Sequence, residues 1–460
     1  MEGGKRNEVK GVKKPVQRLK IQGSRIIFPL ALCVLIATVA GSIFAQDRFP
    51  QPEFQRDYQL PELTTPAPRK GIYEYLDVAV LIACLTCATF LALKRRSRAG
   101  IFMLMLFSLF YFGFWRKGCV CPIGSIQNIV LLFFDRSYKI PLVILAFFTL
   151  PLLFTLFFGR TFCAAVCPLG AIQDLFILRP VQLPSWVSEP LGMFPYIYLG
   201  LAVLSAAAGA EFLICRFDPF IAIFRISAQF PMILLGSGIL IAGSFISRPY
   251  CRFLCPYSVL LKWMSRFSKY HLTISPDDCI QCRLCEGSCP FGAIQVPTEE
   301  QVQERNVIGI RRLLILLILL PFLIFSGGLV GSRLDIPFSR LHRTVSLAEQ
   351  ISLEDAGIVT ETTLASRTFR ETGRTKAELI NEALIIRQRF KRGGVLFGGL
   401  LGLVFGIKII ALSVRRKRDR YEPDRAACFS CGRCVDFCVK EKAQRKALAF
   451  VNKSSNHESS

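Results

Sequence analysis

The sequence predicts an all-α integral membrane bundle of about eight transmembrane helices, joined to a small cysteine-rich module of mixed α+β structure on the cytoplasmic side. Hydrophobic side chains make up 52% of the chain, and the mean hydropathy is +0.43. Several apolar runs reach the roughly 20 residues that a helix needs to cross a bilayer. The 18 cysteines are grouped at short spacings. These features exclude a soluble enzyme built around a single core.

The formal net charge of +24 has a specific distribution along the chain. Lys and Arg flank the apolar runs, as in Lys94 to Arg98 and Arg415 to Arg418. This is the pattern that the positive-inside rule predicts for cytoplasmic loops. No basic stretch alternates with stacking aromatic residues, so we expect contact with membrane lipid and no binding of nucleic acid.

Hydropathy and composition divide the chain into nine segments. They are a basic cytoplasmic tail (1–25), a first span or signal anchor (26–45), an outer Pro-rich linker (46–70), a membrane core (71–265), a first cysteine run (266–305), a span (306–331), an extracytoplasmic insertion (332–393), a last span (394–414) and a second cysteine run (415–460). A cleaved signal peptide is the alternative for the first span.

Eight spans are expected in these segments. They are 26–45, 73–93, 99–115, 140–159, 195–214, 226–246, 308–330 and 394–414, while the short stretch 126–134 is expected at the interface. With the N-terminus inside, the loops that begin at Lys94, Arg160, Ser247 and Arg415 all fall in the cytoplasm. We therefore expect the basic loops and the cysteine runs to share one face.

Cys279, Cys282, Cys285 and Cys289, followed by Pro290, have the spacing of a bacterial ferredoxin run. Two-residue gaps let successive thiolates surround one cubane cluster, while backbone amides donate hydrogen bonds to sulfur. A structural zinc site is the alternative, because soft thiolates also bind zinc. The spacing predicts a [4Fe-4S] cluster.

The same spacing recurs beyond the last span, at Cys428, Cys431, Cys434 and Cys438. In two-cluster ferredoxins the fourth cysteine of each run binds the other cluster. We therefore expect Cys438 to join the first three cysteines of the first run, and Cys289 to join the first three of the second. The two runs must then meet on the cytoplasmic face as a ferredoxin-like module.

Two further cysteine pairs follow predicted spans, Cys163 with Cys167 and Cys251 with Cys255, and each pair ends in Cys-Pro. Their similarity indicates an internal repeat. Inert buried thiols are the alternative. Together the two pairs offer four ligands for a third cluster; alternatively, each pair shares ligands with another group. We therefore expect at least two clusters on the cytoplasmic side and at most three.

Three cysteines are expected near the outer surface: Cys119, Cys121 and Cys215. Our hypothesis is an outer or intramembrane redox site, either an iron-sulfur cluster or a reversible disulfide. The hydrocarbon core is about 30 Å thick, which is too far for one efficient electron hop. Cys84 and Cys87, on one helix face near mid-membrane, are expected to be small hydrophobic side chains or a further redox pair, and Cys33 is expected to be a small hydrophobic residue.

Few other residues offer chemistry within the membrane. Glu211 precedes Cys215 by four residues, and is either an interfacial residue or a participant in proton-coupled quinol chemistry. The three histidines are His271, His342 and His457, and none lies in a predicted span. A haem held by two histidines within the membrane is thereby excluded.

The paired Cys-x3-Cys-Pro units and the following run resemble the membrane-bound polyferredoxins of the NapH/NosR/CcoG type, over residues 99–295. The stretch from Gly159 to Gln173 is most similar to the NosR branch. The resemblance implies electron transfer in the cell (inner) membrane, from a cytoplasmic or quinol donor to an extracytoplasmic acceptor, or service to metalloenzyme maturation. The chain departs from the type in its outer insertion and its widely separated runs.

The residues themselves predict one-electron transfer between clusters with no covalent catalysis and no catalytic residue. The protein would be an electron carrier or an oxidoreductase component rather than a stand-alone enzyme, with redox proteins and quinol as partners. Two alternatives stay open. One is a membrane metal reductase or metalloenzyme maturation factor, and the other is a non-catalytic redox sensor.

Overall fold

A computed structural model describes residues 71–118, 121–135, 138–210, 212–225, 230–274, 279–298, 306–359, 362–413, 418, 420–440 and 443. The predicted first span, Cys33, Cys119, Glu211 and His457 lie outside these residues. Helices dominate the described part, and the strands form one two-stranded sheet there.

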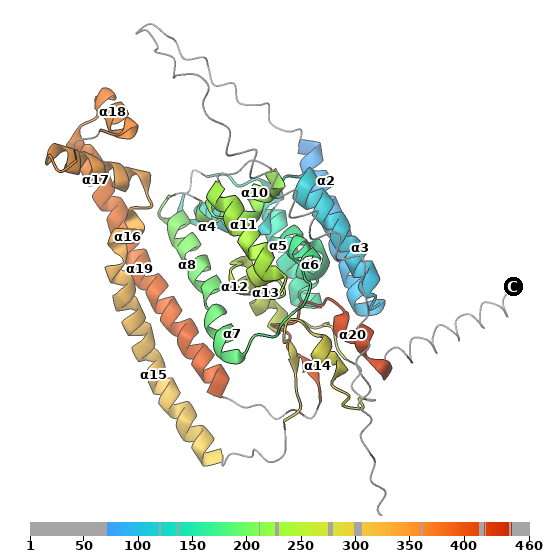
Figure 1. Cartoon of the computed structure of the whole chain (residues 1–460). Helices are drawn as coiled ribbons and strands as arrows, with labels where there is room; N and C mark the ends of the chain where they lie inside the picture. Colours follow the sequence, from blue (N-terminus) through green and yellow to red (C-terminus); the bar gives the residue numbers. More distant parts are fainter. Residues whose placement is uncertain are drawn as a thin grey trace, which may run out of the picture. The chain divides into compact units, whose positions relative to one another are not determined.

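The membrane core is built from helices between residues 71 and 266 (Figure 1). They are α2 (Gly71–Thr89), α3 (Arg98–Ser108), α4 (Pro122–Phe134), α5 (Leu142–Phe158), α6 (Pro168–Leu175), α7 (Ser185–Leu191), α8 (Phe194–Ala207), α9 (Leu213–Arg216), α10 (Pro219–Arg225), α11 (Phe230–Gly243), α12 (Pro249–Phe253) and α13 (Tyr257–Arg266). Three π-helical turns adjoin them: η1 (Phe90–Lys94), η2 (Leu109–Trp115) and η3 (Phe162–Val166). Such turns often mark functional positions.

Within the described residues, five helical segments are long and apolar enough to cross a membrane. They are Gly71–Lys94, Arg98–Trp115, Ser185–Ala207, Ile308–Arg333 and Lys376–Ser413. A sixth arises if α10 and α11, which bend by 105°, count as one span. The helix expected at 140–159 is α5, with 17 residues, and the span expected at 195–214 begins earlier, at Ser185. The number eight therefore stays a prediction.

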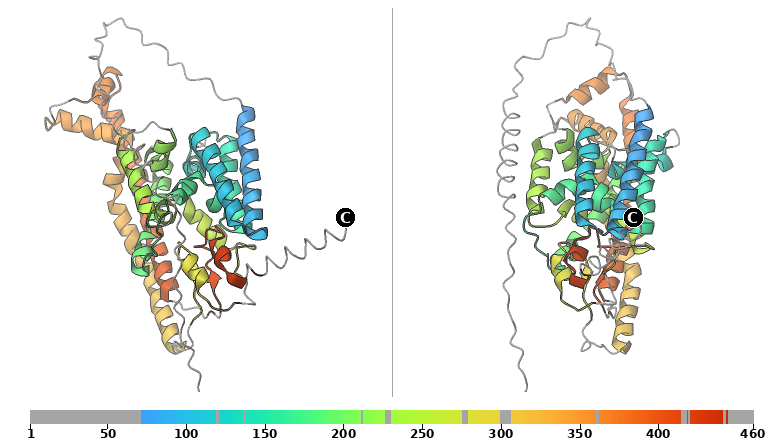
Figure 2. Two further views of the ribbon diagram at one scale, coloured as in Figure 1. Left: turned by 45° about the vertical axis from the view of Figure 1, so that its right-hand side comes forward. Right: turned by 90° about the vertical axis from the view of Figure 1, so that its right-hand side faces the viewer.

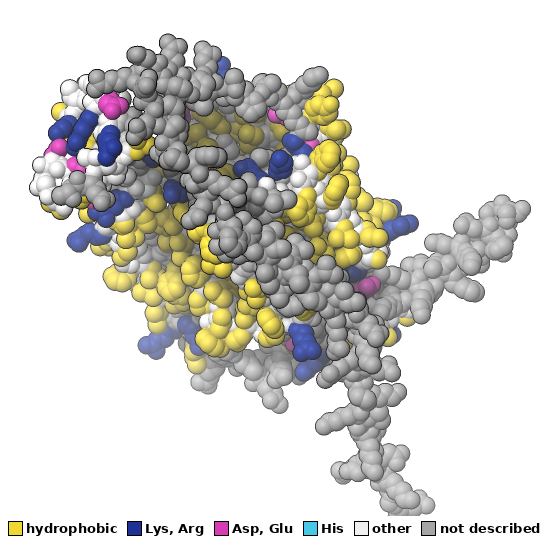
Figure 3. Space-filling model, turned by 45° about the horizontal axis from the view of Figure 1, so that its top comes forward, with side chains coloured by type: hydrophobic (Ala, Val, Ile, Leu, Met, Phe, Trp, Pro, Cys, Tyr) yellow, Lys and Arg dark blue, Asp and Glu magenta, His cyan; other side chains and the backbone are white. Residues whose placement is uncertain are grey.

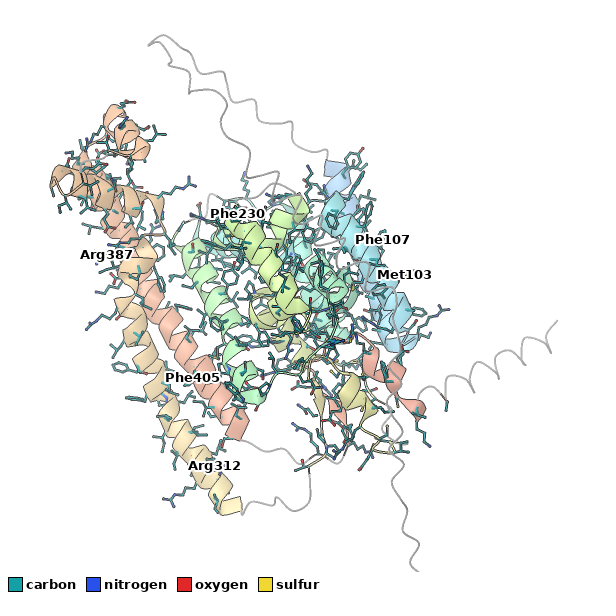
Figure 4. All side chains as sticks on the ribbon, in the orientation of Figure 1. Met103, Phe107, Phe230, Arg312, Arg387 and Phe405 are labelled. Atoms are coloured by element: carbon teal, nitrogen blue, oxygen red, sulfur yellow. The ribbon has the colours of Figure 1, made fainter. Side chains whose placement is uncertain are left out.

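Large apolar side chains cover the flank of the bundle (Figure 3). Met103 and Phe107 on α3 are 68% and 48% exposed, and they point away from the bundle in Figure 4. Such a continuous apolar surface requires a partner other than water. Together with the span candidates, it identifies a multi-pass membrane protein.

A long hairpin stands beside the core, formed by α15 (Asn306–Arg333) and α19 (Lys376–Ser413) (Figure 2). Glycines allow its two backbones to approach closely: a side chain on Gly327 or Gly331 would collide with the backbone of Gly398 or Gly394. Small residues at four-residue spacing bring membrane helices together in this way. The hairpin is therefore a tightly packed unit.

The predicted insertion between the last two spans is helical. It contains α16 (Asp335–Ser339), α17 (Arg343–Asp355) and α18 (Leu364–Glu371), and it continues into the first half of α19. Val345, Ile351, Phe369 and Phe390 form a small apolar core that also includes Leu204 and Ala208 at the end of α8. In Figures 1 and 2 this part lies at the opposite end of the hairpin from the cysteine runs.

The two cysteine runs come together at the other end of the hairpin. They contribute α14 (Leu284–Ser288), β1 (Ile294–Gln295), β2 (Glu422–Pro423) and α20 (Arg433–Phe437). The strands pair antiparallel, with Ile294 opposite Pro423. The amide of Asp424 also donates to the carbonyl of Ala293, at 2.8 Å. The two runs therefore meet, and we call this assembly the module; its cytoplasmic side and its ferredoxin-like character stay predictions.

Candidate functional site

Four cysteines from both runs line one cavity of the module: Cys279, Cys282, Cys285 and Cys438. Gln281 and Arg283 adopt positive φ angles of 51° and 59°, which curl the loop and turn its cysteines toward a common centre. Burial raises the pKa of Cys285. We call these four cysteines the first set; the fold brings them together, and their cross-run pairing as cluster ligands stays a prediction.

A second set joins Cys428, Cys431 and Cys434 to Cys289, and the thiols of these residues interact electrostatically. Backbone amides donate to two of the sulfurs: Ser430 to Cys428 and Ala293 to Cys289, each at 3.4 Å. Burial raises the pKa of Cys428 to about 12. A buried thiolate is stable only beside a cation. Iron binds thiolates and lowers the pKa of the thiols that bind it, so this set of sulfur donors fits iron.

An inner set consists of Cys163, Cys167, Cys251 and Cys255, all of them buried. The turn η3 and the helix α12 hold the two pairs so that Cys167 interacts with the other three thiols. The side-chain amide of Gln173 donates to the sulfur of Cys251 at 3.3 Å. Burial raises the pKa of Cys251 to about 11, against the opposing charge of Arg248. The paired units thus form one group of four thiols.

Two buried arginines connect the inner set to the second set. Arg160 donates to the carbonyl of Ala426 at 3.2 Å, and its guanidinium lies 4.1 Å from the centre of the Phe429 ring. Arg248 donates to the carbonyls of Cys163 and Ala164 and lies 5.6 Å from the same ring. The ring of Phe429, which lies between Cys428 and Ser430 in the sequence, is thus close to both cations.

Asp174 is the counter-ion in this region. Its carboxylate accepts from Arg248 at 2.9 Å and from Arg98 at 3.2 Å, and Arg98 also donates to the carbonyl of Cys431. Sequence reasoning overlooked Asp174 and the arginines. A signal was present, because Arg160 and Arg248 each precede the first cysteine of a pair by three residues. A repeated Arg-x2-Cys pattern marks both positions.

Cys121 and Cys215, two of the predicted outer cysteines, lie close enough to interact electrostatically, and buried Asp218 interacts with Cys121. The Cys215 sulfur lies 3.3 Å from where a Gly124 Cβ would stand. Cys121 in turn interacts with Cys255 of the inner set. The outer pair therefore adjoins the inner set.

The same local design holds both groups. The sequences after Cys121 and Cys167 share the pattern Pro-x-Gly-x-Ile-Gln. Gln127 accepts a hydrogen bond from the amide of Ile214 at 2.9 Å, and Gln173 accepts one from the amide of Tyr250 at 3.0 Å. Gln127 thus holds the residue before Cys215, and Gln173 holds the residue before Cys251. The internal repeat therefore includes the segment that contains Cys121, one of the two cysteines of the outer pair.

Cys84 and Cys87 have different surroundings, since Cys84 is buried and Cys87 is exposed. Among the described residues, no three His, Cys, Asp or Glu side chains are arranged to hold a single metal ion.

Comparisons with known families agree with the cysteine patterns. A family described as "4Fe-4S binding domain" (Fer4_5) matches residues 98–141, 140–184 and 228–275, and a second 4Fe-4S binding domain family (Fer4) matches residues 272–295. The chain is a membrane-bound protein of the polyferredoxin type. The three Fer4_5 matches extend the repeat in this polyferredoxin from two copies to three, and the additional copy contains Cys119 and Cys121.

Three curated relatives share part of the polyferredoxin. YccM of Escherichia coli (strain K12), whose name provisionally assigns it to electron transport, is 26% identical over 140 residues, 28% of this chain and 38% of YccM. Protein MJ0749 of Methanocaldococcus jannaschii is 29% identical over 122 residues, 26% of this chain and 43% of that protein. NirI of Paracoccus denitrificans (strain Pd 1222) is 30% identical over 122 residues, 25% of this chain and 18% of NirI.

The matches thus span less than half the length of these relatives. No solved structure matches significantly. The families and the relatives support 4Fe-4S clusters and a membrane electron-transfer role. The similarity to the NosR branch in particular stays a prediction.

Proposed function

We propose that this protein conducts single electrons through a series of [4Fe-4S] clusters, from a cytoplasmic or quinol donor toward an acceptor outside the inner membrane. The main support is the position of two buried arginines, Arg160 and Arg248. Arg160 and Arg248 each contact both the inner set and the second run, which supports a short step between the two cysteine sets. Adjacent cysteine groups provide the short steps that electron transfer requires.

Three clusters would occupy the module and its border with the membrane core, one each in the first, second and inner sets. The clusters supply one-electron redox chemistry. The cysteines hold them, and amides such as those of Ser430 and Ala293 stabilise charge on sulfur. Arg160, whose guanidinium lies 3.7 Å from the Cys163 sulfur, favours the reduced, more negative state of the inner cluster.

Transfer across the bilayer would continue through Cys119, Cys121 and Cys215. The electrostatic interaction between Cys121 and Cys255 supports this route, because the outer pair would then adjoin the inner set. The module would face the cytoplasm. Three basic loops support that orientation, since Arg98, Arg160 and Arg248 each contact the second run, and such loops remain in the cytoplasm.

Reconstitution into sealed liposomes tests the proposal. Anaerobically purified protein is reduced from the module side, by quinol or by a soluble low-potential donor, and reduction of an impermeant acceptor on the other side is followed. We expect steady transfer, and we expect loss of transfer when Cys119, Cys121 and Cys215 are all replaced by serine. Unchanged transfer in that variant would contradict the outer route.

Other outcomes of the same experiment identify the alternatives. Turnover that requires copper would indicate a metal reductase. Reversible cluster titration without any turnover would indicate a sensor. Zinc-loaded protein that lacks iron would overturn the electron-transfer proposal itself.

A further inference from the structure

Two cavities meet between the membrane core and the hairpin. An apolar cavity of about 840 Å³ lies between α8, α13 and α19 and is lined by residues such as Leu199, Val203 and Leu400. A second cavity, of about 650 Å³, lies beside the module. Tyr196, Trp263 and Val404 line both cavities, so the apolar cavity and the polar cavity adjoin, and we call the two together the passage.

The polar part carries an excess of positive charge. Its lining contains five cations and two acids: Arg160, Arg252, Lys262, Arg266 and Lys408, with Glu189 and Asp424. Both acids are already engaged. Glu189 pairs with Lys408 at 3.0 Å, while Asp424 accepts from the side chain of Gln295 and the amide of Ala426. Four cations are left without an acidic partner in this lining.

Two buried donors in the lining have no hydrogen-bond partner among the described residues: the Nε atom of Arg160 and one Nη atom of Arg252. Arg160 is 1% exposed. A buried charged donor without an acceptor is costly, so the Nη atom of Arg252 indicates an anionic ligand in this cavity. The aromatic rings of Phe291 and Phe429, next to the predicted cluster ligands, line the same cavity.

We propose that the passage binds an anionic phospholipid, with its phosphate among Arg252, Lys262 and Arg266 and its acyl chains in the apolar cavity. Both halves of the ligand are needed. A neutral isoprenoid quinone would leave Arg252, Lys262 and Arg266 without an anionic group in the cavity, and a soluble anion would leave the apolar cavity unfilled. The site lies at the module end, where the positive-inside rule and anionic lipids would both place it.

Fluorescence of Trp263 provides a direct test, because this side chain lines both cavities. Trp115 and Trp186 are replaced by Phe, and the full-length protein is placed in nanodiscs of phosphatidylcholine. Phosphatidylglycerol with brominated acyl chains is then added in increasing amounts. We expect it to quench Trp263 at much lower mole fractions than brominated phosphatidylcholine does.

Charge variants locate the headgroup. In the double variant Lys262→Gln/Arg266→Gln, we expect the preference for phosphatidylglycerol to fall roughly fivefold for each lost cation. The matched control is Arg374→Gln/Lys376→Gln, which removes two exposed cations of the insertion that line neither cavity. The control should keep the preference. Native mass spectrometry of each variant reports bound lipid independently of fluorescence.

Three outcomes would overturn the proposal. The first is equal quenching by the two brominated lipids, and the second is an unchanged preference in Lys262→Gln/Arg266→Gln. The third is displacement of the brominated lipid by isoprenoid quinone at equal mole fraction, which would identify a quinone site. None of these outcomes bears on iron content, so the lipid site and the electron-transfer function fail or stand separately.

Discussion

The guanidinium of Arg160 lies 4.1 Å from the centre of the Phe429 ring and joins the inner cysteine set to the second run. It also donates to Ala426 and, at 3.0 Å, to Ser258. Lysine would keep the charge but lose the planar fork that makes these contacts together. Arg160→Lys should therefore lower stability by about 1–3 kcal/mol.

Thermal unfolding in detergent measures this loss, and paramagnetic resonance of the reduced protein should report altered spectra of the second and inner clusters. The control is Arg374→Lys, at an exposed arginine of the insertion whose side chain pairs with Glu382. If Arg160→Lys matched the wild type in both measurements, the proposed role of the contact would be wrong.

Asp174→Asn should destabilise the core, because it leaves the buried charge of Arg248 without its anionic partner. Breaking such a pair costs about 3–5 kcal/mol. Burial opposes ionisation, but the charges of Arg248 and Arg98 lower the pKa of Asp174 to about 2. The carboxylate therefore contributes stability above its unfolded pKa of roughly 4, and the contribution is lost as pH falls toward 2.

Unfolding curves of the wild type and Asp174→Asn should thus converge as the medium is acidified through this range. The matched control, Asp355→Asn, alters a partly exposed carboxylate that pairs with Lys376. Exposed ion pairs contribute little, so no comparable change is expected there. Parallel curves at every pH would contradict the assignment.

The cross-run pairing predicts which cluster each cysteine substitution removes. Cys438→Ser should abolish the cluster held by Cys279, Cys282 and Cys285, whereas Cys434→Ser should abolish the cluster shared with Cys289. Each variant should lose about four irons per chain. Iron analysis and paramagnetic resonance check this, with exposed Cys87→Ser as the control. Loss of the same spectroscopic signal in both variants would show that each run binds its own cluster.

Close backbone contact in the hairpin makes Gly398→Leu disruptive, because the new side chain would strike the backbone of Gly327. We expect a decrease in stability of about 1–3 kcal/mol and poorer assembly of the second cluster. Gly309→Leu, on the same hairpin with open space around it, serves as the control. Equal stability of the two variants would contradict the packing described here.

The proposed lipid site should weaken in alkaline solution. Burial, reinforced by the charges around it, lowers the pKa of Lys262 to about 8. Above that pH its positive charge is lost, so the preference for phosphatidylglycerol should decline between about pH 7 and 9. The charged groups of the cavity that face it are Arg160, Arg252, Arg266, Lys408, Glu189 and Asp424, and Cys255 lies beyond. In Lys262→Gln, the quenching assay should show no such pH-dependent fall in the preference. A fall of equal size in this variant would assign the pH dependence to another group.

Local patterns in the sequence were sufficient to predict cysteine sets whose members the fold brings together, while their roles as cluster ligands stay predictions. Ligand spacing is a short-range property, so Cys279 to Cys289 could be interpreted without a fold, and the exchange of fourth ligands followed from cluster chemistry. The partners of the inner set were not predictable in the same way. Asp174 meets Arg248 across 74 residues, and neither residue carries a motif that indicates the other.

Hydropathy located the membrane segments better than it described their shapes. It marked the apolar half of α19 as a span, but the helix begins at Lys376, because a helix continues wherever its side chains find partners. It also gave no sign of the 105° bend between α10 and α11. The passage beside α19 arises from the packing of three helices, so it could not have been predicted from the sequence.

The pairing of Ile294 with Pro423 has a consequence for biogenesis. In the sequence, β1 precedes the hairpin and β2 follows it. The ribosome must therefore complete both hairpin helices, and the translocon must release them, before the two strands can pair. In the proposed pairing, a nascent chain that ends at residue 305 carries three ligands of the first cluster but only Cys289 of the second. Iron delivery to these two sites must therefore wait until membrane insertion is complete.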